Sequence, residues 1–354
     1  MANRREFLLQ SVAACVSASV SLRTTYAATA ARNPGTVQTV QGPLDAAKLG
    51  FTLPHEHVCV NSPGFWQLWP ELFGSRASFA AKAVDRLKAA KDAGIDTIVD
   101  VTPPDVGRDI RLLEDVSRKS GMQIVACTGH WLYPSLSWES RTAEELTDFF
   151  TLEIERGIEG TDIKPGVIKV ATDKDGVTPF LENVLRAAAR TSKATGIPIT
   201  THTHALGRGG EKQAEIFENE GLNPVSVCVG HSDNSKDLDY LTGLAKRGYT
   251  IGMDHLTRGA SATQAQTLSW RERAETVAKL IAAGFADRIF LSNDWFFGAS
   301  LGPAGFMQQM EALNPDGMLF NVRKTIPYLK ELGVTDAQLR TITVENPRRF
   351  FGGR

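Results

Sequence analysis

The stretch FTLPHEHVCV, residues 51–60, is the first of the short apolar runs that decide the fold of this chain. It also contains two histidines that flank a glutamate. Apolar runs of similar length recur along the chain, and such runs predict buried strands. There are eight of them: Phe51–Val60, Thr97–Val101, Ile124–Thr128, Gly166–Ala171, Ile197–His202, Ser226–His231, Tyr249–Asp254 and Arg288–Ser292.

Amphipathic stretches of helical period separate most of these runs, as in Ser78–Ala93 and Glu182–Ala194. Eight repeats of strand and helix predict an α/β fold, a single closed (β/α)₈ TIM barrel. An open, doubly wound sheet is less favoured, because no glycine-rich phosphate loop follows the first run. Glycine stands just before several of the runs, where helices usually end: Gly94, Gly196, Gly248 and Gly284.

The overall composition limits the choice of partners. Thirty-nine lysine and arginine residues nearly balance forty aspartate and glutamate residues among 354. A nearly neutral chain gives no reason to expect binding to nucleic acid or to an anionic membrane surface. We therefore expect a small substrate with little net charge. The length suits one barrel, since such domains run to about 250 residues or more.

The first thirty residues form a separate segment. Arg4 and Arg5 precede a mild apolar stretch that ends in small residues. This order predicts a twin-arginine export signal over residues 1–30, removed on maturation, and a barrel domain over residues 31–354. We expect a periplasmic protein. A disordered basic tail is less favoured, and so is lipid attachment at Cys15 with association to the membrane.

The remaining cysteines and the apolar runs indicate a protein without disulfides or membrane spans. Cys59, Cys127 and Cys228 lie in apolar, strand-like runs, which is typical of buried thiols. Their odd number argues against a disulfide framework. No run after the first thirty residues has the roughly 20 apolar residues needed to cross a bilayer.

The ends of the predicted strands carry nearly all of the histidines. In a (β/α)₈ barrel, the carboxyl ends of the strands form the mouth of the active site. His204 lies two residues after His202, and we expect it to have a structural role. The candidate ligands and catalytic groups at these ends are His55, His57, Lys169, His202, His231, His255 and Asp294.

The spacing of these groups predicts two metal ions. His55 and His57 stand two residues apart on one strand, so their side chains point the same way and can hold one ion. Asp294 can supply an oxygen to that ion. His202 and His231, on neighbouring strands, can hold a second ion.

Two neighbouring cations need an anion between them, and Lys169 is the obvious candidate. An ammonium group between two divalent ions would be repelled, so a buried Lys169 should be neutral. A neutral amine can react with carbon dioxide to form a carbamate, whose two oxygens can reach one ion each. The sequence therefore predicts a binuclear centre at the carboxyl ends of the strands.

Each of these signals is weak by itself. A single histidine usually belongs to the core or the surface, and a lysine in a strand usually extends its ammonium group into water. An aspartate at a strand end often caps a helix. Six suitable groups at the ends of five strands favour metal binding over these simpler explanations.

Several segments give the chain a resemblance to the bacterial phosphotriesterases, the aryldialkylphosphatases of the amidohydrolase superfamily, over about residues 35–351. The resemblance implies the same six ligands, His55, His57, carboxylated Lys169, His202, His231 and Asp294. It also implies two divalent ions, zinc first with cobalt or manganese as alternatives, and a homodimer with Trp69 and Phe73 at its interface. The segments are PHEHV (54–58), GFWQLWPELFGS (64–75), TIVDV (97–101), GVIKVAT (166–172), TTHT (200–203), GHSD (230–233), SNDW (292–295) and NPDGM (314–318).

The resemblance further implies the hydrolysis of neutral organophosphate triesters. A hydroxide that bridges the metals would attack phosphorus, while Asp294 takes its proton and His255 carries that proton outward. Trp131 would stack against the leaving group. The other expected substrate-binding residues are Val60, Val106, Leu132, Arg258, Phe296, Leu301 and Met310.

The chain departs from this family pattern around the substrate and the proton route. Asn234 replaces the carboxylate that holds the shuttle histidine, and Arg258 replaces a second histidine. Val60 replaces a glycine, and Ala299 and Gly302 replace an aromatic pair near the leaving group. The loop after the seventh strand is also shorter. These departures leave the metal ligands intact and put the substrate preference in doubt.

Two other functions compete with triester hydrolysis. Lactonases on the same scaffold usually have an arginine in place of His255 and a tyrosine near Trp131, so both positions favour the triesterase. The other alternative is an exported protein that binds metal without catalysis. The presence of both Asp294 and His255 argues against it, since binding alone needs no route for a proton.

Overall fold

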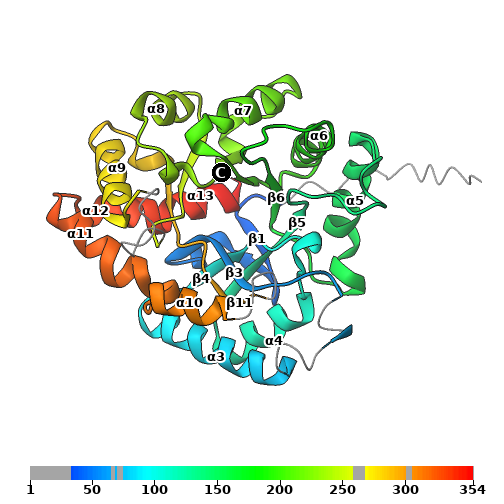
Figure 1. Cartoon of the computed structure of the whole chain (residues 1–354), viewed down its shortest axis with the longest axis horizontal. Coiled ribbons are helices and arrows are strands. Elements are labelled where there is room, and N and C mark those ends of the chain that lie inside the picture. Colours follow the sequence, from blue (N-terminus) through cyan, green and yellow to red (C-terminus); the bar gives the residue numbers. More distant parts are fainter. Residues whose placement is uncertain (1–32, 65–67, 70–74, 258–267, 300–304, 354) are drawn as a thin grey trace, which may run out of the picture. The chain divides into compact units, whose positions relative to one another are not determined.

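The computed structural model describes residues 33–64, 68–69, 75–257, 268–299 and 305–353. Within them, nine parallel strands form one curled sheet in the order β10-β9-β8-β7-β6-β5-β4-β3-β11 (Figure 1). All eight predicted runs contain a strand. The strands are β3 (Thr52–Val60), β4 (Thr97–Asp100), β5 (Gln123–Gly129), β6 (Val167–Ala171), β7 (Ile199–His202), β8 (Val227–Val229), β9 (Thr250–Met253), β10 (Ile289–Leu291) and β11 (Phe296–Ala299).

The curl of the sheet follows from the connection between its two edges. β10 and β11 lie at opposite edges, yet only the segment 292–295 separates them in the chain. Nine strands spaced about 4.8 Å apart would put the edges of a flat sheet roughly 38 Å apart. The chain from Leu291 to Phe296 reaches about 18 Å at most. The edges must therefore approach one another, which is consistent with a TIM-like barrel.

Hydrogen bonds to β3 join the two edges. The backbone N–H of His55 donates to Ser292 Oγ at 3.0 Å, and the N–H of Asp294 donates to the carbonyl of His55 at 3.1 Å. The N–H of His57 donates to the carbonyl of Trp295 at 2.8 Å. The predicted eighth run thus contains β10 alone, and β11, which the sequence did not predict, follows a short segment that is bonded directly to β3.

Helices surround this sheet, mostly one after each strand (Figure 1). The four glycines predicted to end helices all have positive φ, a conformation that glycine adopts without strain. At Gly196, this conformation caps α6. The helices are α3 (Arg76–Asp92), α4 (Ile110–Ser120), α5 (Ala143–Arg156), α6 (Pro179–Thr195), α7 (Gly209–Asn219), α8 (Leu238–Lys246), α9 (Trp270–Ala282), α10 (Phe306–Leu313), α11 (Ile326–Glu331), α12 (Asp336–Arg340) and α13 (Asn346–Gly352).

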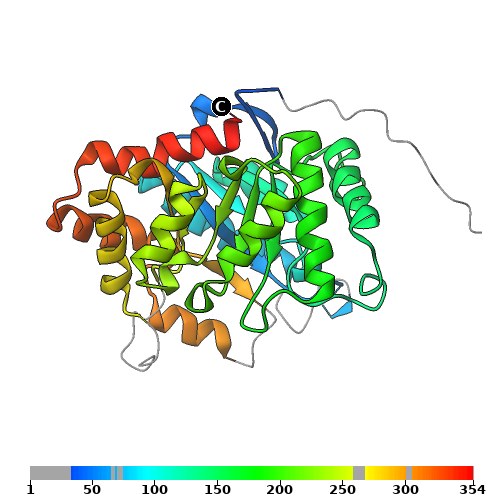
Figure 2. The ribbon, with the colours of Figure 1, turned by 90° about the horizontal axis from the view of Figure 1, so that it is seen from above.

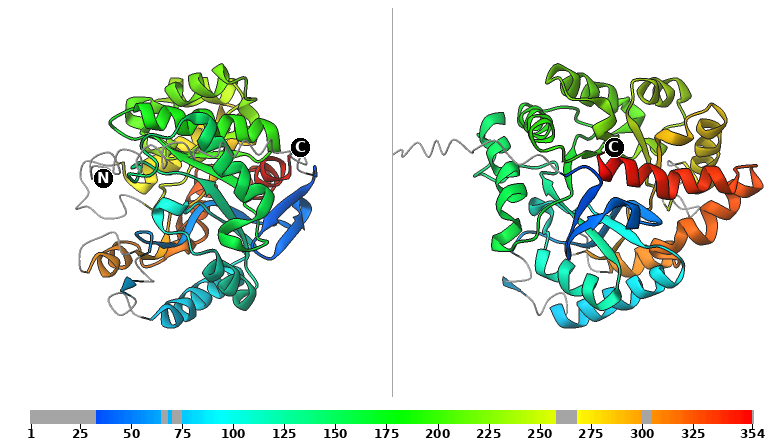
Figure 3. Two further views of the ribbon diagram at one scale, coloured as in Figure 1. Left: turned by 90° about the vertical axis from the view of Figure 1, so that its right-hand side faces the viewer. Right: turned by 180° about the vertical axis from the view of Figure 1, so that it is seen from behind.

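A hairpin that the sequence did not predict covers the amino-terminal end of the sheet. β1 (Thr36–Thr39) and β2 (Gly42–Asp45) pair antiparallel and lie beside α13 (Figures 2 and 3). The N–H of Gly35 donates to the carbonyl of Gly352 at 2.7 Å. Figure 2 shows α10 at the opposite end, where the strands finish. The hairpin and α13 therefore leave the carboxyl ends of the strands uncovered.

The interior of the sheet and the layer beneath the helices form the apolar core. Cys59, Cys127 and Cys228 are buried, and none is paired in a disulfide among the described residues, as predicted. No helix in the described parts of the chain is both long and apolar enough to cross a membrane.

Candidate metal centre

The carboxyl end of β3 brings two histidines to the residue that splits the last strand. His57 Nε2 lies 3.1 Å from Asp294 Oδ1, and His55 Nε2 lies 3.6 Å from the same oxygen. His57 Nδ1 contacts Thr102 Oγ1 at 2.8 Å, which turns Nε2 toward the aspartate. The possible ligand atoms of His55, His57 and Asp294 all lie within 4.8 Å of one another. This group can hold a metal ion.

A second pair of histidines comes from β7 and the end of β8. His202 Nδ1 and His231 Nε2 lie 2.8 Å apart. Burial lowers the pKa of both rings, and it lowers that of His231 well below its usual value. Neutral imidazoles are the form that binds metal ions. His231 is also held at φ 56°, an unusual conformation for a residue with a side chain.

Lys169, on β6, lies among these histidines with only 2% of its surface exposed. Its Nζ is 2.7 Å from His55 Nε2. Burial lowers the pKa of the Lys169 ammonium, although the carboxylates of Asp294 and Asp254 partly offset this effect. Burial of the His55 ring and, second, the positive charge of Lys169 lower the pKa of His55 well below its usual value. The environment favours an uncharged amine, which is the form that can become a carbamate.

Asp294 is held in a strained conformation by its neighbours. Its φ of 50° is unusual for a residue other than glycine. Glu56, which alternation directs away from the two histidines of β3, accepts hydrogen bonds on both sides of Asp294. The donors are the side chain of Ser292, the backbone and side chain of Asn293, and the backbone of Trp295, at 2.8–3.0 Å. These bonds fix the aspartate where it meets the histidines.

The charge of Asp294 is set by two opposing effects. Burial by itself would raise the pKa of this carboxyl group. Hydrogen bonds from His255 and His57 outweigh burial and hold the pKa well below its usual value. Asp294 is therefore an ionised carboxylate at neutral pH. The donor set of neutral imidazoles, a buried lysine and a carboxylate fits divalent cations such as zinc.

The comparisons with known proteins agree with this geometry. The Phosphotriesterase family model matches residues 35–351. The Phosphotriesterase homology protein of Mycobacterium tuberculosis is 38% identical over 331 residues, which cover 89% of this chain and 97% of that protein. The chain belongs to the phosphotriesterase family. This family is one of metal-dependent hydrolases.

Other relatives show the range of this family. The Aryldialkylphosphatase of Saccharolobus solfataricus is 35% identical over 310 residues, covering 87% of this chain and 96% of that protein. The N-acetyltaurine hydrolase of Salmo salar is 27% identical over 355 residues, covering 90% and 98%. The solved structure of the phosphotriesterase from Mycobacterium tuberculosis has a TM-score of 0.83 and 37% identity, covering 89% and 98%. Membership in the phosphotriesterase family therefore does not fix the substrate.

Beside the candidate ligands of this phosphotriesterase-family chain lies a residue to which sequence reasoning gave no role. Asp254, at the end of β9, is buried and accepts from both the backbone N–H and Nδ1 of His231, at 2.7 and 2.8 Å. Its other oxygen lies 2.9 Å from His55 Nδ1. One carboxylate thus contacts a histidine from each predicted ion site. Its place at a strand end beside His255 was the signal that could have revealed it.

His255 occupies a hydrogen-bonded position beside Asp294. Its Nε2 lies 2.9 Å from Asp294 Oδ2, and its ring stacks on His231 with centroids 3.8 Å apart. Its backbone N–H donates to the buried carboxylate of Asp233. The His255 side chain therefore touches the carboxylate of Asp294 and the neighbouring Asn234, which lies at its other ring nitrogen.

The predicted substrate-binding residues fall into separate environments. Trp131 meets the edge of the His202 ring, with centroids 5.9 Å apart, and Asp105 accepts from its backbone N–H. Phe296, at the start of β11, stacks on the rings of Trp295 and Phe306, with centroids 5.8 and 6.0 Å apart. Val106 and Leu132 are buried, and Val60 is half-buried at the end of β3.

Other predicted residues lie farther from the ligands or outside the described residues. Met310 packs with Trp295 and Phe297 in the core beneath the helices. Arg258, Leu301, Gly302 and Phe73 lie outside the described residues. Trp69, expected at a dimer interface, is 48% exposed in the chain. His204 Nδ1 lies 3.7 Å from Asp173 Oδ1, at the outer side of the His202 ring.

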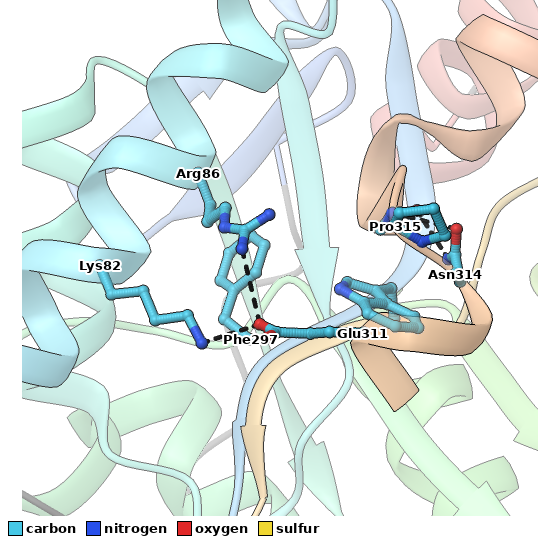
Figure 4. Close-up of a pocket in the computed structure, with 8 residues that line it drawn as sticks. Lys82, Arg86, Phe297, Glu311, Asn314 and Pro315 are labelled. Atoms are coloured by element: carbon cyan, nitrogen blue, oxygen red, sulfur yellow. Dashed lines mark hydrogen bonds and ion pairs between the residues drawn. The ribbon is translucent and has the colours of Figure 1, made fainter. Parts of the chain in front are cut away.

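A cavity of about 210 Å³ lies between α3 and α10, on the other side of β11 (Figure 4). Lys82 and Arg86 both reach Glu311 across it, at 2.8 and 3.5 Å. Trp295 and Phe297 form its apolar wall. The described residues that line this cavity include none of the candidate metal ligands, so the cavity is separate from them.

Proposed function

We propose that this chain hydrolyses neutral organophosphate triesters with two divalent metal ions, zinc first, bridged by a carbamate on Lys169. The observation that carries the proposal is the buried Lys169 amine, 2.7 Å from His55 Nε2 and surrounded by the other predicted ligands. Burial favours the neutral form of this amine. The relative named Aryldialkylphosphatase supports a phosphate triester as the substrate class.

Within this proposal, the TIM barrel is a complete (β/α)₈ domain, and its ligands divide into two groups. His55, His57 and Asp294 hold one ion, and His202 and His231 hold the other. When bound, the two ions supply a hydroxide nucleophile near neutral pH and polarise the phosphoryl oxygen.

The residues of the chain then position the substrate and receive the proton. Asp294, an ionised carboxylate at the centre of the site, accepts the proton of the nucleophile. His255 is hydrogen-bonded to the outer oxygen of Asp294 and so governs its orientation. Trp131 lies at the edge of His202 and contacts an aromatic leaving group. Val60, Val106, Leu132 and Phe296 shape an apolar pocket for the other ester groups.

An activity panel on zinc-loaded protein tests this function. After reconstitution in bicarbonate, we expect two zinc ions per chain by elemental analysis and turnover of a chromogenic aryl dialkyl phosphate. Asp294→Asn should abolish turnover, because an amide cannot accept the proton. One zinc ion or none would refute the binuclear centre.

The same panel separates the competing functions. A lactone tests the related lactonase activity, and an N-acyl amino sulfonate tests the activity for which the Salmo salar relative is named. Cleavage of either substrate without cleavage of the triester would refute the proposed substrate class and keep the metal centre. Two bound zinc ions without turnover of any substrate would favour a protein that binds metal without catalysis.

We also propose export by the twin-arginine route to the periplasm, with removal of residues 1–30, and assembly as a homodimer. The motivation is the paired Arg4 and Arg5 before a mild apolar stretch. Arg4→Lys together with Arg5→Lys should leave the protein in the cytoplasm. Mass spectrometry of the exported protein distinguishes cleavage near Ala30 from lipid attachment at Cys15, and sedimentation measures the dimer.

A further inference from the structure

The side chains of Asn234 and His255 meet beside Asp294. Asn234 Nδ2 lies 3.0 Å from His255 Nδ1, and Asn234 Oδ1 lies 3.2 Å from the same ring nitrogen. The other ring nitrogen, Nε2, lies 2.9 Å from Asp294 Oδ2. The hydrogen-bonding role of the imidazole therefore depends on which end of the amide faces it.

A buried arginine determines the orientation of this amide. Arg273, on α9, is 2% exposed, and its Nη1 lies 2.6 Å from Asn234 Oδ1 and 2.7 Å from the backbone carbonyl of Asp233. A guanidinium group has donors only, so the amide atom that it contacts must be the oxygen. The amide nitrogen is then directed to His255. An amide nitrogen also has donors only.

The two contacts of the His255 ring select the same position for the proton. Asn234 Nδ2 is the nearer amide atom and donates to Nδ1 at 3.0 Å, so Nδ1 carries the lone pair while Oδ1 is held by Arg273. The carboxylate of Asp294 accepts, so Nε2 must carry the hydrogen. We propose that Arg273 and Asn234 are positioning residues that hold His255 as its Nε2–H tautomer, a fixed hydrogen-bond donor to Asp294.

Further contacts keep the ring from turning over. The backbone N–H of His255 donates to both oxygens of Asp233, at 3.1 and 3.0 Å. The ring itself stacks on His231 with planes 18° apart. Because the ring plane is fixed, Nδ1 continues to face Asn234 and Nε2 continues to face Asp294.

This tautomer closes the route that the sequence predicted for the proton. Transfer from Asp294 through His255 needs a lone pair on Nε2 and an acceptor beside Nδ1. This chain has an N–H at the first position and an N–H donor beside the second. The proton on Asp294 therefore passes directly to water, to which its side chain is 13% exposed. Only this consequence rests on the proposed function; the tautomer does not.

Nitrogen NMR on the zinc-loaded full chain tests the tautomer. In protein labelled with ¹⁵N-histidine, long-range ¹H–¹⁵N correlation distinguishes a nitrogen with a hydrogen from one with a lone pair. The signals of His255 are identified by their absence in His255→Gln. We expect Nε2 to be the pyrrole-like nitrogen and Nδ1 the pyridine-like one.

Asn234→Asp should move the hydrogen. The carboxylate keeps an oxygen for Arg273 and offers a second oxygen to His255, so Nδ1 should become pyrrole-like. Asn223→Asp is the matched control, because Asn223 is exposed and its side-chain oxygen accepts from the backbone N–H of Val225 at 3.2 Å, away from His255. We expect it to leave the His255 signals unchanged.

Two outcomes would overturn the proposal. One is a pyrrole-like Nδ1 in the wild-type protein. The other is an unchanged pyridine-like Nδ1 in Asn234→Asp, which would show that the amide does not set the tautomer. Neither readout depends on turnover. A protein that shows the expected tautomer but does not hydrolyse triesters would refute the proposed function alone.

Discussion

Replacing Asp254 with asparagine should weaken the binding of one of the two proposed metal ions and leave the binding of the other nearly unchanged. Oδ1 of Asp254 accepts from the backbone N–H and Nδ1 of His231, so the amide oxygen of the variant should stay there. The amide nitrogen then replaces Oδ2, which lies 2.9 Å from His55 Nδ1. Because an amide nitrogen only donates, it favours a lone pair on Nδ1 of His55 and the hydrogen on Nε2. His55 Nε2 faces Asp294 and Lys169, so its lone pair is lost as a ligand.

The size of this effect follows from the role of such supporting carboxylates. Loss of a group that orients a metal-bound histidine typically weakens metal binding by about 10–100-fold, which corresponds to about 1.4–2.7 kcal/mol. In Asp254→Asn, the binding of the ion proposed at His55 and His57 should weaken by this amount. The ion held by His202 and His231 should change much less, because His231 keeps both of its hydrogen bonds to residue 254.

A zinc titration against a chromogenic chelator measures both binding steps. Asp237→Asn is the control, because Asp237 caps α8 and pairs with Arg208 at the surface. The control should bind zinc like the wild type. Equal weakening of both steps in Asp254→Asn, or two unchanged steps, would refute the selective role of the His55 contact.

Four further predictions concern the bridge, the pocket, the proton and the acid limit of stability. Lys169→Ala should lower turnover by at least about 10²-fold, and short carboxylic acids should partly restore it in a rescue assay; no rescue would argue against a carbamate bridge. Dimethyl and diethyl phosphotriesters should be hydrolysed roughly tenfold to a few hundredfold faster than diisopropyl ones, and a kcat/KM series that runs the other way would contradict a restricted pocket. Asn234→Asp should raise kcat for an activated aryl triester by up to about 10²-fold and leave a poor leaving group nearly unchanged; equal rates on both substrates would show that proton removal does not limit turnover. In metal-free protein, the lowered pKa values of His55, His202 and His231 favour the folded state above the unfolded histidine pKa of about 6.5. Stability should therefore fall as the pH drops below about 6.5, and a thermal midpoint that stays constant down to pH 5 would contradict neutral histidines.

The sequence was sufficient to predict the strands and the groups at their ends. The apolar run that contains His55 and His57 gave both the strand β3 and the direction of its side chains. Lys169, His202 and His231 lie where the repeat of strand and helix predicted, since a parallel sheet brings all carboxyl ends to one side. These predictions were possible because buried strands and half-buried helices leave regular apolar patterns in the sequence.

Features that depend on contacts across the fold were not predictable. The hairpin β1–β2 is too short to have a clear apolar period, and the strand β11 follows a break whose backbone N–H groups donate to Glu56. The amide orientation of Asn234 depends on Arg273, which lies on α9 and is separated from Asn234 by 38 residues of sequence. The asparagine at position 234, in place of the carboxylate of the family pattern, shows that the partner of His255 differs. The orientation of its amide group follows only from the contact with Arg273.

The short segment 292–295 joins the two edges of the sheet and also contains Asp294. During synthesis, the histidines and Lys169 leave the ribosome before this segment, so a nascent chain holds most of the candidate ligands without the last carboxylate. The final ligand therefore arrives together with the residues that bring the edges together. Tight binding of the proposed ions should therefore report that the two edges of the sheet have met.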